Sequence, residues 1–331
     1  MMTYKAKSAL VDGLSTTLSY PNTPEHGEMA VDEPPVMPGG KDKGPNPMDL
    51  CLAALGTCQE ISYKAFATVM GIEVKSVAAV IEGELDLRGF LGVDPNTPMG
   101  FSKITGTVTV DAPDATDEQL AALKGAVDAH CPMCDFLGGT CTMTLGLDCK
   151  PSEGLAAGND EGLSAEAIGD LGAALGADPA AAMVIYKSSS KLEKGLCTSV
   201  TLPNTPHHGP YVIDEPSAMP GGQNKGPNPM DLCLGALSTC QDITYKAYAT
   251  AMSIPLAKVE TSIEGDLDLR GFLGVGEGVR PGFQAIRGTV TLYSSASEEQ
   301  LKTLKGAVDA HCPMCATVCQ PVCPDLKVVK A

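Results

Sequence analysis

The sequence predicts an α+β protein built from two similar repeats, each with an antiparallel sheet wrapped on a long central helix. The first observation is a duplication, because PGGKDKGPNPMDLCLAALGTC, beginning at Pro38, returns at Pro220 as PGGQNKGPNPMDLCLGALSTC. The second is the run from Met48 to Met70, which contains no proline and is apolar or small on most sides, as in a helix covered by its neighbours. The third is the set of short β-prone stretches that precede and follow this run in both copies.

The repeats divide the 331 residues into three parts. Tyr4 and Tyr186 occupy equivalent positions, which assigns residues 1–150 to the first repeat and 183–331 to the second. Each repeat is long enough to bury a core of its own. Residues 151–182 are acidic and rich in Ala and Gly, as in a linker, and Ser164–Leu175 can form one short helix. A linker of this length permits the two repeats to pack together with their central helices hidden.

Local signals give the order of elements in the first repeat. Pro47 marks the start of the central helix, and Thr116 with Gln119 resembles a capping box at the start of a second helix, which Pro132 interrupts. In the second repeat, CATVCQPVCPDLKVVK stands where the last strand is expected, interrupted by cysteine and proline. In the first repeat we expect helices at Met48–Met70 and Thr116–His130, and strands at Tyr4–Ser8, Thr16–Tyr20, Glu28–Asp32, Val74–Leu87, Phe101–Val110 and Cys141–Leu147.

Composition and charge exclude several classes of partner. The net charge of -17 and the pI near 4.6 argue against nucleic acid and anionic lipid, which are bound mainly by cations. The sequence has neither an apolar leader nor a run of about 18 apolar residues, so we expect a soluble protein with no membrane partner. The thirteen cysteines are odd in number and several lie in apolar helical runs, which favours reduced thiols and a cytoplasmic location.

Two separated cysteine motifs recur in the same order in both repeats. Cys51 and Cys58 are two helical turns apart, about 10 Å along the axis, which is too far for a disulfide. An oxidative partner for Cys58 must therefore come from the second shared motif, HCPMC, and we expect the pairing of Cys58 with Cys131. The simpler interpretation is that cysteine serves as a small buried hydrophobic residue, which is most plausible for Cys51 and Cys233.

A reactive thiol in a buried helix needs a charge that favours the thiolate, because desolvation raises its pKa. Of the four arginines only Arg88 and Arg270 are equivalent, both within DLRGFLGV, and they are the candidates for the activating charge. The alternative for them is a solvated loop residue or a surface ion pair. His26 and His208 are further shared candidates, with a role in a turn as the alternative.

The C-x-x-C spacing in the second motif suits redox exchange or one half of a metal site. Cys131 either ends the preceding helix or begins a new turn before Pro132, where its pKa would fall. The C-terminal run of cysteines approaches an iron–sulfur pattern without matching its spacing. Glycine-rich phosphate loops, H-E-x-x-H and G-x-S-x-G are absent from the sequence, so we expect no nucleotide cofactor and no serine hydrolase. The run comprises Cys312, Cys315, Cys319 and Cys323.

GPNPMDLCLAALGTC, followed by HCPMC about seventy residues later, resembles the OsmC/Ohr superfamily of osmotically induced and organic hydroperoxide resistance proteins, over nearly all of both repeats. The resemblance implies interlocking halves with long helices held between two antiparallel sheets, here paired as an intramolecular pseudo-dimer. It also implies reduction of organic hydroperoxides in the stress response, with Cys58 and Cys240 as peroxidatic cysteines and Cys131 and Cys312 as resolving cysteines.

The chain departs from the family pattern at two places. The Glu that the peroxidases carry ten residues before the reactive cysteine is replaced by Met48 and Met230, and the N-terminal strand region has lysines such as Lys5 where the family has an activating Arg. Three hypotheses follow. The first is a thiol peroxidase that acts on a small hydroperoxide and is reduced by a dithiol such as a lipoyl or thioredoxin-like protein, with Arg88 stabilising the thiolate. The second is a non-enzymatic module for a small ligand or partner, and the third is a metal or redox-relay site at the C-terminal cysteines. Further self-association is left open.

Overall fold

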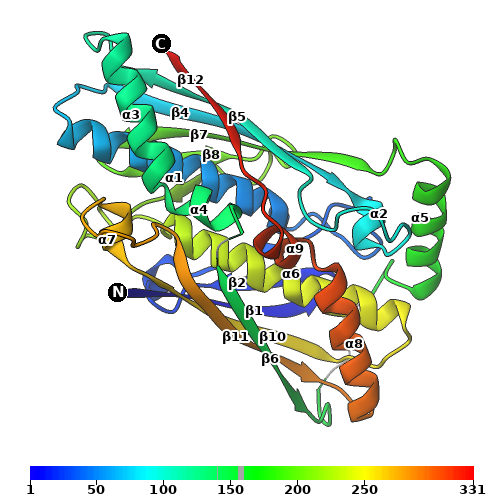
Figure 1. The fold of residues 1–331 in the computed structure, drawn as a ribbon. Coiled ribbons are helices and arrows are strands. Elements are labelled where there is room, and N and C mark those ends of the chain that lie inside the picture. The colour runs from blue at the N-terminus through cyan, green and yellow to red at the C-terminus, as the bar shows by residue number, and fades with distance from the viewer. Residues whose placement is uncertain (140, 156–159) are drawn as a thin grey trace.

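The computed structural model describes residues 1–139, 141–155 and 160–331, and in this part of the chain two six-stranded sheets enclose two long helices (Figure 1). Each sheet combines strands of both repeats, as an intramolecular pseudo-dimer requires. The first sheet runs in the order β3 (Glu28–Val31), β2 (Ser15–Ser19), β1 (Met2–Asp12), β10 (Lys258–Leu267), β11 (Phe283–Tyr293) and β6 (Thr142–Lys150). The second runs in the order β12 (Asp325–Lys330), β5 (Lys103–Asp111), β4 (Ser76–Asp86), β7 (Met183–Lys194), β8 (Cys197–Thr201) and β9 (Tyr211–Ile213).

The two central helices are α1 (Pro47–Val69) and α6 (Pro229–Ala251), and both confirm the predicted element. Each helix is capped by an asparagine whose side-chain oxygen accepts a hydrogen bond from a backbone amide of the first turn. The residue after each asparagine is a proline, which is the first residue of the helix. α1 packs on α6 and on strands β4, β7 and β8, while α6 packs on β1, β2 and β10. Both helices are therefore buried over most of their length. None of the described helices combines the length and apolarity needed to cross a membrane.

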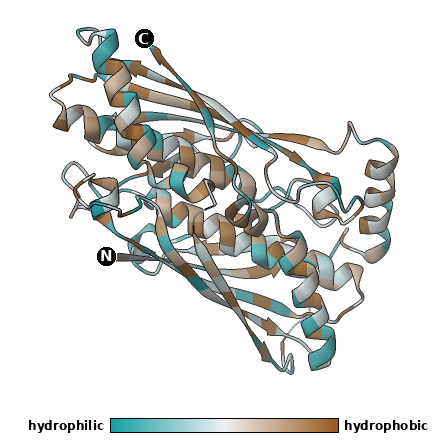
Figure 2. Ribbon diagram, viewed as in Figure 1, coloured by the Kyte–Doolittle hydropathy of each residue, from teal (hydrophilic) through white to brown (hydrophobic). Residues whose placement is uncertain are grey.

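Shorter helices flank the central pair. α3 (Asp117–His130) and α8 (Glu298–His311) both begin with complete capping boxes, as the sequence predicts for α3, and pack on α1 and α6 respectively. α5 (Ala165–Ala177) is the helix expected in the linker and packs on α6; residues 156–159 of the linker lie outside the described residues. Figure 2 shows hydrophilic residues on the outer ends of α3 and α8. The short helices are η1 (Pro24–His26), α2 (Leu87–Phe90), α4 (Pro132–Leu137), α7 (Leu269–Phe272) and α9 (Pro313–Cys319).

The last strand of each repeat does not complete its own repeat in the expected way. β6 pairs in parallel with β11 of the second repeat, from Thr142 opposite Ala285 to Lys150 opposite Tyr293. The C-terminal tail, where cysteine and proline interrupt the segment expected to be the last strand, forms α9 and then β12, which pairs in parallel with β5. In both cases the strand satisfies backbone groups that would otherwise be unpaired at the edge of the sheet.

Candidate active site

The sulfur atoms of the two cysteine motifs meet in both repeats. In the first repeat Cys58 Sγ on α1 lies 3.5 Å from Cys131 Sγ, and in the second Cys240 Sγ on α6 lies 3.4 Å from Cys312 Sγ. All four thiols are free and buried. Because a disulfide bond is about 2.05 Å long, each pair could be joined by a shift of about 1.5 Å.

The local fold places Cys131 between two helices. α3 ends at His130 because Cys131 takes an extended backbone, with φ -71° and ψ 117°, and Pro132 then begins α4. Cys131 is thus the C-cap of α3 and also the N-cap of α4. It both ends the preceding helix and begins the next, the two positions that the sequence allowed. Cys312 has the same role between α8 and α9.

Hydrogen bonding gives the two thiols of a pair different acidities. Burial alone would raise the pKa of Cys131, but hydrogen bonds from the Cys134 and Cys58 thiols and from the backbone amides of Cys134 and Met133 hold the pKa well below its usual value. The hydrogen bond to Cys131, followed by burial, raises the pKa of Cys58. In the second repeat the pKa of Cys312 is likewise lowered and that of Cys240 raised. The proton therefore stays on Cys58 while negative charge is favoured on Cys131.

A third thiol completes the cluster. The hydrogen bond to Cys131, followed by burial, raises the pKa of Cys134. The side chain of Gln59, the neighbour of Cys58 on α1, donates from Nε2 to Cys134 Sγ at 3.3 Å. In the second repeat Gln241 Nε2 donates to Cys315 Sγ at 2.9 Å. Each C-x-x-C motif is therefore held against the central helix through both of its cysteines.

Cys58 faces a narrow pocket whose other walls come largely from the second repeat. Its free space is about 20 Å³, enough for one water-sized group. The walls are mainly apolar and include Met230, Leu267 and Phe272, and Glu215 and Tyr4 are among the polar groups. Cys131 is not among the lining residues, so Cys58 is the sulfur that a molecule in the pocket would meet.

The acid in this pocket, Glu215, is not among the candidate residues predicted from the sequence. Burial, and next the nearby Asp231 charge, raise the pKa of Glu215 to about 8, so its carboxyl group is mostly neutral at pH 7. Glu33 lines the equivalent pocket of Cys240 together with Met48 and Tyr186, and its pKa is also raised to about 8 by burial and by the Asp32 charge. The available signal was an Asp-Glu-Pro triplet at equivalent positions in both repeats.

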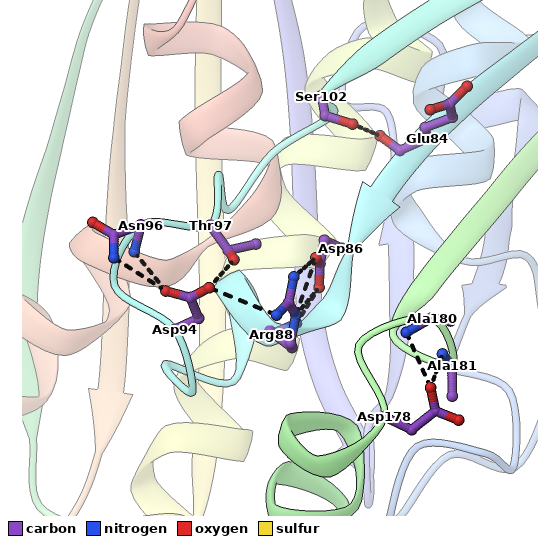
Figure 3. A network of polar contacts seen from close by, with 10 residues as sticks. All are labelled: Glu84, Asp86, Arg88, Asp94, Asn96, Thr97, Ser102, Asp178, Ala180 and Ala181. Carbon is purple, nitrogen blue, oxygen red and sulfur yellow. Dashed lines mark hydrogen bonds and ion pairs between the residues drawn. The ribbon is translucent and has the colours of Figure 1, made fainter.

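Arg88 and Arg270 are held by carboxylates of their own loops (Figure 3 shows the first). Arg88 pairs with Asp86 at 2.6 Å and with Asp94 at 3.6 Å, and Arg270 pairs with Asp268 at 2.6 Å. Neither arginine is among the described residues that line the two cysteine pockets. These ion pairs instead fix the short helices α2 and α7.

The DLRGF segment contributes to the site through its other residues. Leu269 and Phe272 of α7 line the Cys58 pocket, and the Gly271 carbonyl oxygen lies 2.8 Å from Nδ1 of His130, the residue before Cys131. The segment from one repeat thus supports the cysteine motif of the other.

The remaining sequence candidates lie elsewhere. His26 Nε2 lies 3.0 Å from the Asn224 carbonyl oxygen, and His208 Nε2 lies 2.7 Å from that of Asp42, so both hold a loop of the other repeat. The C-terminal Cys319 and Cys323 are exposed.

Two further features lie apart from the cysteine pairs. Over residues 1–139, 141–155 and 160–331, the one group of three potential metal ligands is Asp42, His207 and His208. A larger cavity of about 410 Å³ lies between the repeats, lined by apolar residues such as Tyr20, Leu50 and Leu202 and separate from both cysteine pockets.

The chain is similar to known proteins of the OsmC family. The chain is similar to the solved structure of the OsmC like protein from Mycoplasma pneumoniae, with 19% sequence identity and a TM-score of 0.35, over 44% of this chain and 95% of that chain. None of the curated proteins matches it. The model of the OsmC family, described as OsmC-like protein, matches residues 40–146 and 222–326, more than half of the chain. The chain therefore belongs to the OsmC-like protein family, with one family match in each repeat.

Proposed function

We propose that each repeat is a thiol peroxidase that reduces organic hydroperoxides, with Cys58 and Cys240 as peroxidatic cysteines and Cys131 and Cys312 as resolving cysteines. The observation that carries the proposal is the contact between the sulfurs, 3.5 Å and 3.4 Å, in two separate copies of the site. The apolar walls of each pocket favour an alkyl or aryl hydroperoxide over a small polar peroxide.

The first step moves one oxygen atom to sulfur. Cys131 in its thiolate form takes the proton from Cys58 as the Cys58 sulfur attacks the terminal peroxide oxygen and the O–O bond breaks. Cys58 becomes a sulfenic acid, and the departing alkoxide needs a proton. The neutral carboxyl group of Glu215 lines the same pocket and supplies that proton, so the products are the sulfenic acid and an alcohol.

The second step closes the disulfide. The Cys131 sulfur attacks Cys58 sulfenic acid, and the hydroxyl group leaves as water with the proton that Cys131 carried. A dithiol reductant such as a lipoyl or thioredoxin-like protein then returns both sulfurs to thiols by exchange. A reducing compartment such as the cytoplasm suits this cycle, because it keeps such dithiols reduced.

The arginines have an indirect part in this proposal. Arg88 and Arg270 hold α2 and α7, whose leucine and phenylalanine side chains line the pockets. The donors that favour the thiolate of Cys131 are backbone amides and thiols. The acid of each pocket, Glu215 or Glu33, comes from the loop before the central helix of the other repeat. Each pocket therefore has an acid although Met48 and Met230 stand where the family peroxidases have a Glu.

The test mixes reduced protein with cumene hydroperoxide, stops the reaction with acid, and maps disulfides by peptide mass spectrometry. We expect Cys58–Cys131 and Cys240–Cys312 links to form ahead of any other oxidation, and Cys58→Ser to abolish the first link. The exposed Cys149→Ser variant is the matched control. Slow oxidation scattered over all cysteines would contradict the proposal and favour a non-enzymatic ligand-binding module.

A further inference from the structure

We propose that Cys134 is a third redox thiol that carries the disulfide from the buried Cys58–Cys131 pair to the surface of the first repeat, where an external dithiol reduces it. The inference rests on the proposed peroxidase function and concerns how its oxidised form is reduced.

Access to the first disulfide is the problem that the relay solves. Cys58 is 5% exposed and Cys131 is 1% exposed. A reductant must bring a thiolate against one of the two sulfurs, and exchange is slow where that access is blocked. The Cys58 pocket has free space of only about 20 Å³, which admits the terminal oxygen of a hydroperoxide but is too small for the sulfur atom of a lipoyl group or a protein thiol to approach along the disulfide.

Cys134 is placed to attack Cys131. Cys131 is the N-cap of α4 and Cys134 lies three residues later in its first turn, the C-x-x-C spacing that suits redox exchange. Cys131 Sγ lies 3.5 Å from Cys58 Sγ, and the Cys134 thiol is close enough to be among the groups that lower the pKa of Cys131. The Gln59 side chain holds Cys134 Sγ at 3.3 Å, which keeps the third sulfur beside the pair.

Cys134 also faces a different opening from Cys58. It is partly exposed and lines an open surface depression of about 360 Å³ together with Lys124, Asp128 and Cys323. None of the residues that line this depression lines the Cys58 pocket. Peroxide would enter on the Cys58 side, and the reductant would approach on the Cys134 side.

The disulfide passes from Cys58 to Cys134 and then to the external dithiol by successive thiol–disulfide exchange. Cys134, deprotonated, attacks Cys131 Sγ, forms the Cys131–Cys134 bond and displaces Cys58, which takes up a proton and is ready for another peroxide. A thiolate of the external dithiol then attacks Cys134 Sγ and releases Cys131. Cys131 is a good leaving group, because the donors around its sulfur stabilise its thiolate. The second thiol of the reductant displaces Cys134, so the dithiol is oxidised and both protein cysteines are reduced.

The second repeat differs at this point. Its equivalent thiol, Cys315, is 6% exposed, and the surface thiol there is Cys319, one helical turn later on α9. The proposal is therefore restricted to Cys134, and Cys240→Ser gives a protein in which only the first repeat is oxidised by peroxide.

The experiment compares Cys134→Ser with the matched control Cys149→Ser, both in the Cys240→Ser protein. The first readout is one-turnover formation of the Cys58–Cys131 link with cumene hydroperoxide. The second is steady turnover with dihydrolipoamide as reductant. We expect the turnover of the Cys134→Ser protein to fall about tenfold or more beyond any change in its rate of link formation, which the first readout measures separately. The protein that retains Cys134 should also accumulate a Cys131–Cys134 link when the reductant is withheld.

Turnover of Cys134→Ser within about twofold of the control would overturn the relay. Absence of the Cys131–Cys134 link from oxidised protein that retains Cys134 would also overturn it, and this measurement does not depend on whether the variant folds. Failure of the Cys58–Cys131 link to form in protein with every site thiol of the first repeat intact is a different result, because it removes the peroxidase function itself.

Discussion

Replacing Glu215 by Gln is expected to slow peroxide reduction at Cys58 and to remove its decline at high pH. The pKa of Glu215 is raised to about 8 by burial and by the Asp231 charge, so at pH 9 only about a tenth of the carboxyl groups can donate a proton. We therefore expect the wild-type rate at pH 9 to be about tenfold below its plateau near pH 7. Gln can still accept the hydrogen bond from Asn228 but supplies no acidic proton, so the rate at pH 7 should fall about a hundredfold.

The assay is single-turnover formation of the Cys58–Cys131 link, by acid quench and mass spectrometry, between pH 6 and 9.5 in the Cys240→Ser protein. Glu33→Gln is the matched control, because Glu33 lines only the Cys240 pocket, which is silent there. In a Cys58→Ser protein the two substitutions should exchange their effects. A wild-type rate that keeps rising above pH 8, as for an ordinary thiol, would refute the reasoning, and so would equal slowing by both substitutions in one background.

The other predictions concern the arginines, the buried acids and a helix cap. Arg88→Gln and Arg270→Gln should each change the single-turnover rate less than about threefold, since neither guanidinium lines a cysteine pocket. A loss of about a hundredfold would instead support direct stabilisation of a thiolate by the arginine. Asn46→Ala should lower the free energy of unfolding in urea by about 1 kcal/mol, through loss of the cap of α1. The free energy of unfolding should fall as pH rises from about 4.5 to 8, because the pKa of Glu215 is higher in the folded state than in the unfolded state and folding takes up a proton. For Glu215 alone, the loss of unfolding free energy over this pH range reaches about 5 kcal/mol. Urea unfolding at pH 5.5, 7 and 8.5 checks this, and stability that rises over that range would contradict it. The other acids whose raised pKa adds to the effect are Glu33, Asp49, Glu60, Asp231 and Asp242.

The elements that sequence could predict are those fixed by local signals. The cap and proline of α1, and the capping box of α3, lie within a few residues of the helices they start. Local signals do not show which strand the last strand of a repeat pairs with. The alternation in β6 identifies a strand, but its pairing with β11 depends on where the second repeat ends its sheet, which no local pattern states.

The candidate site divides in the same way. The meeting of Cys58 with Cys131 could be expected because both motifs lie in one repeat and recur together. Glu215 and Phe272 reach Cys58 from the other repeat, so spacing within a repeat could not find them. Arg88 is a candidate from the sequence because Arg270 stands at the equivalent position in the second repeat. Equivalence indicates a shared role, and in the structure both arginines pair with carboxylates of their own loops.

Interlocking gives the tandem arrangement a consequence for function. Each cysteine pocket has its thiol pair on one repeat and its acid and much of its apolar wall on the other, so neither repeat holds a complete site alone. Because the two repeats are fused in one chain, they are always present in a one-to-one ratio, and their sequences can diverge from each other. Cys319 already stands where the first repeat has Gly138, beside thiols that are otherwise equivalent. A substitution in a loop of one repeat should therefore be assayed at the cysteine pair of the other, which is where its chemistry would change.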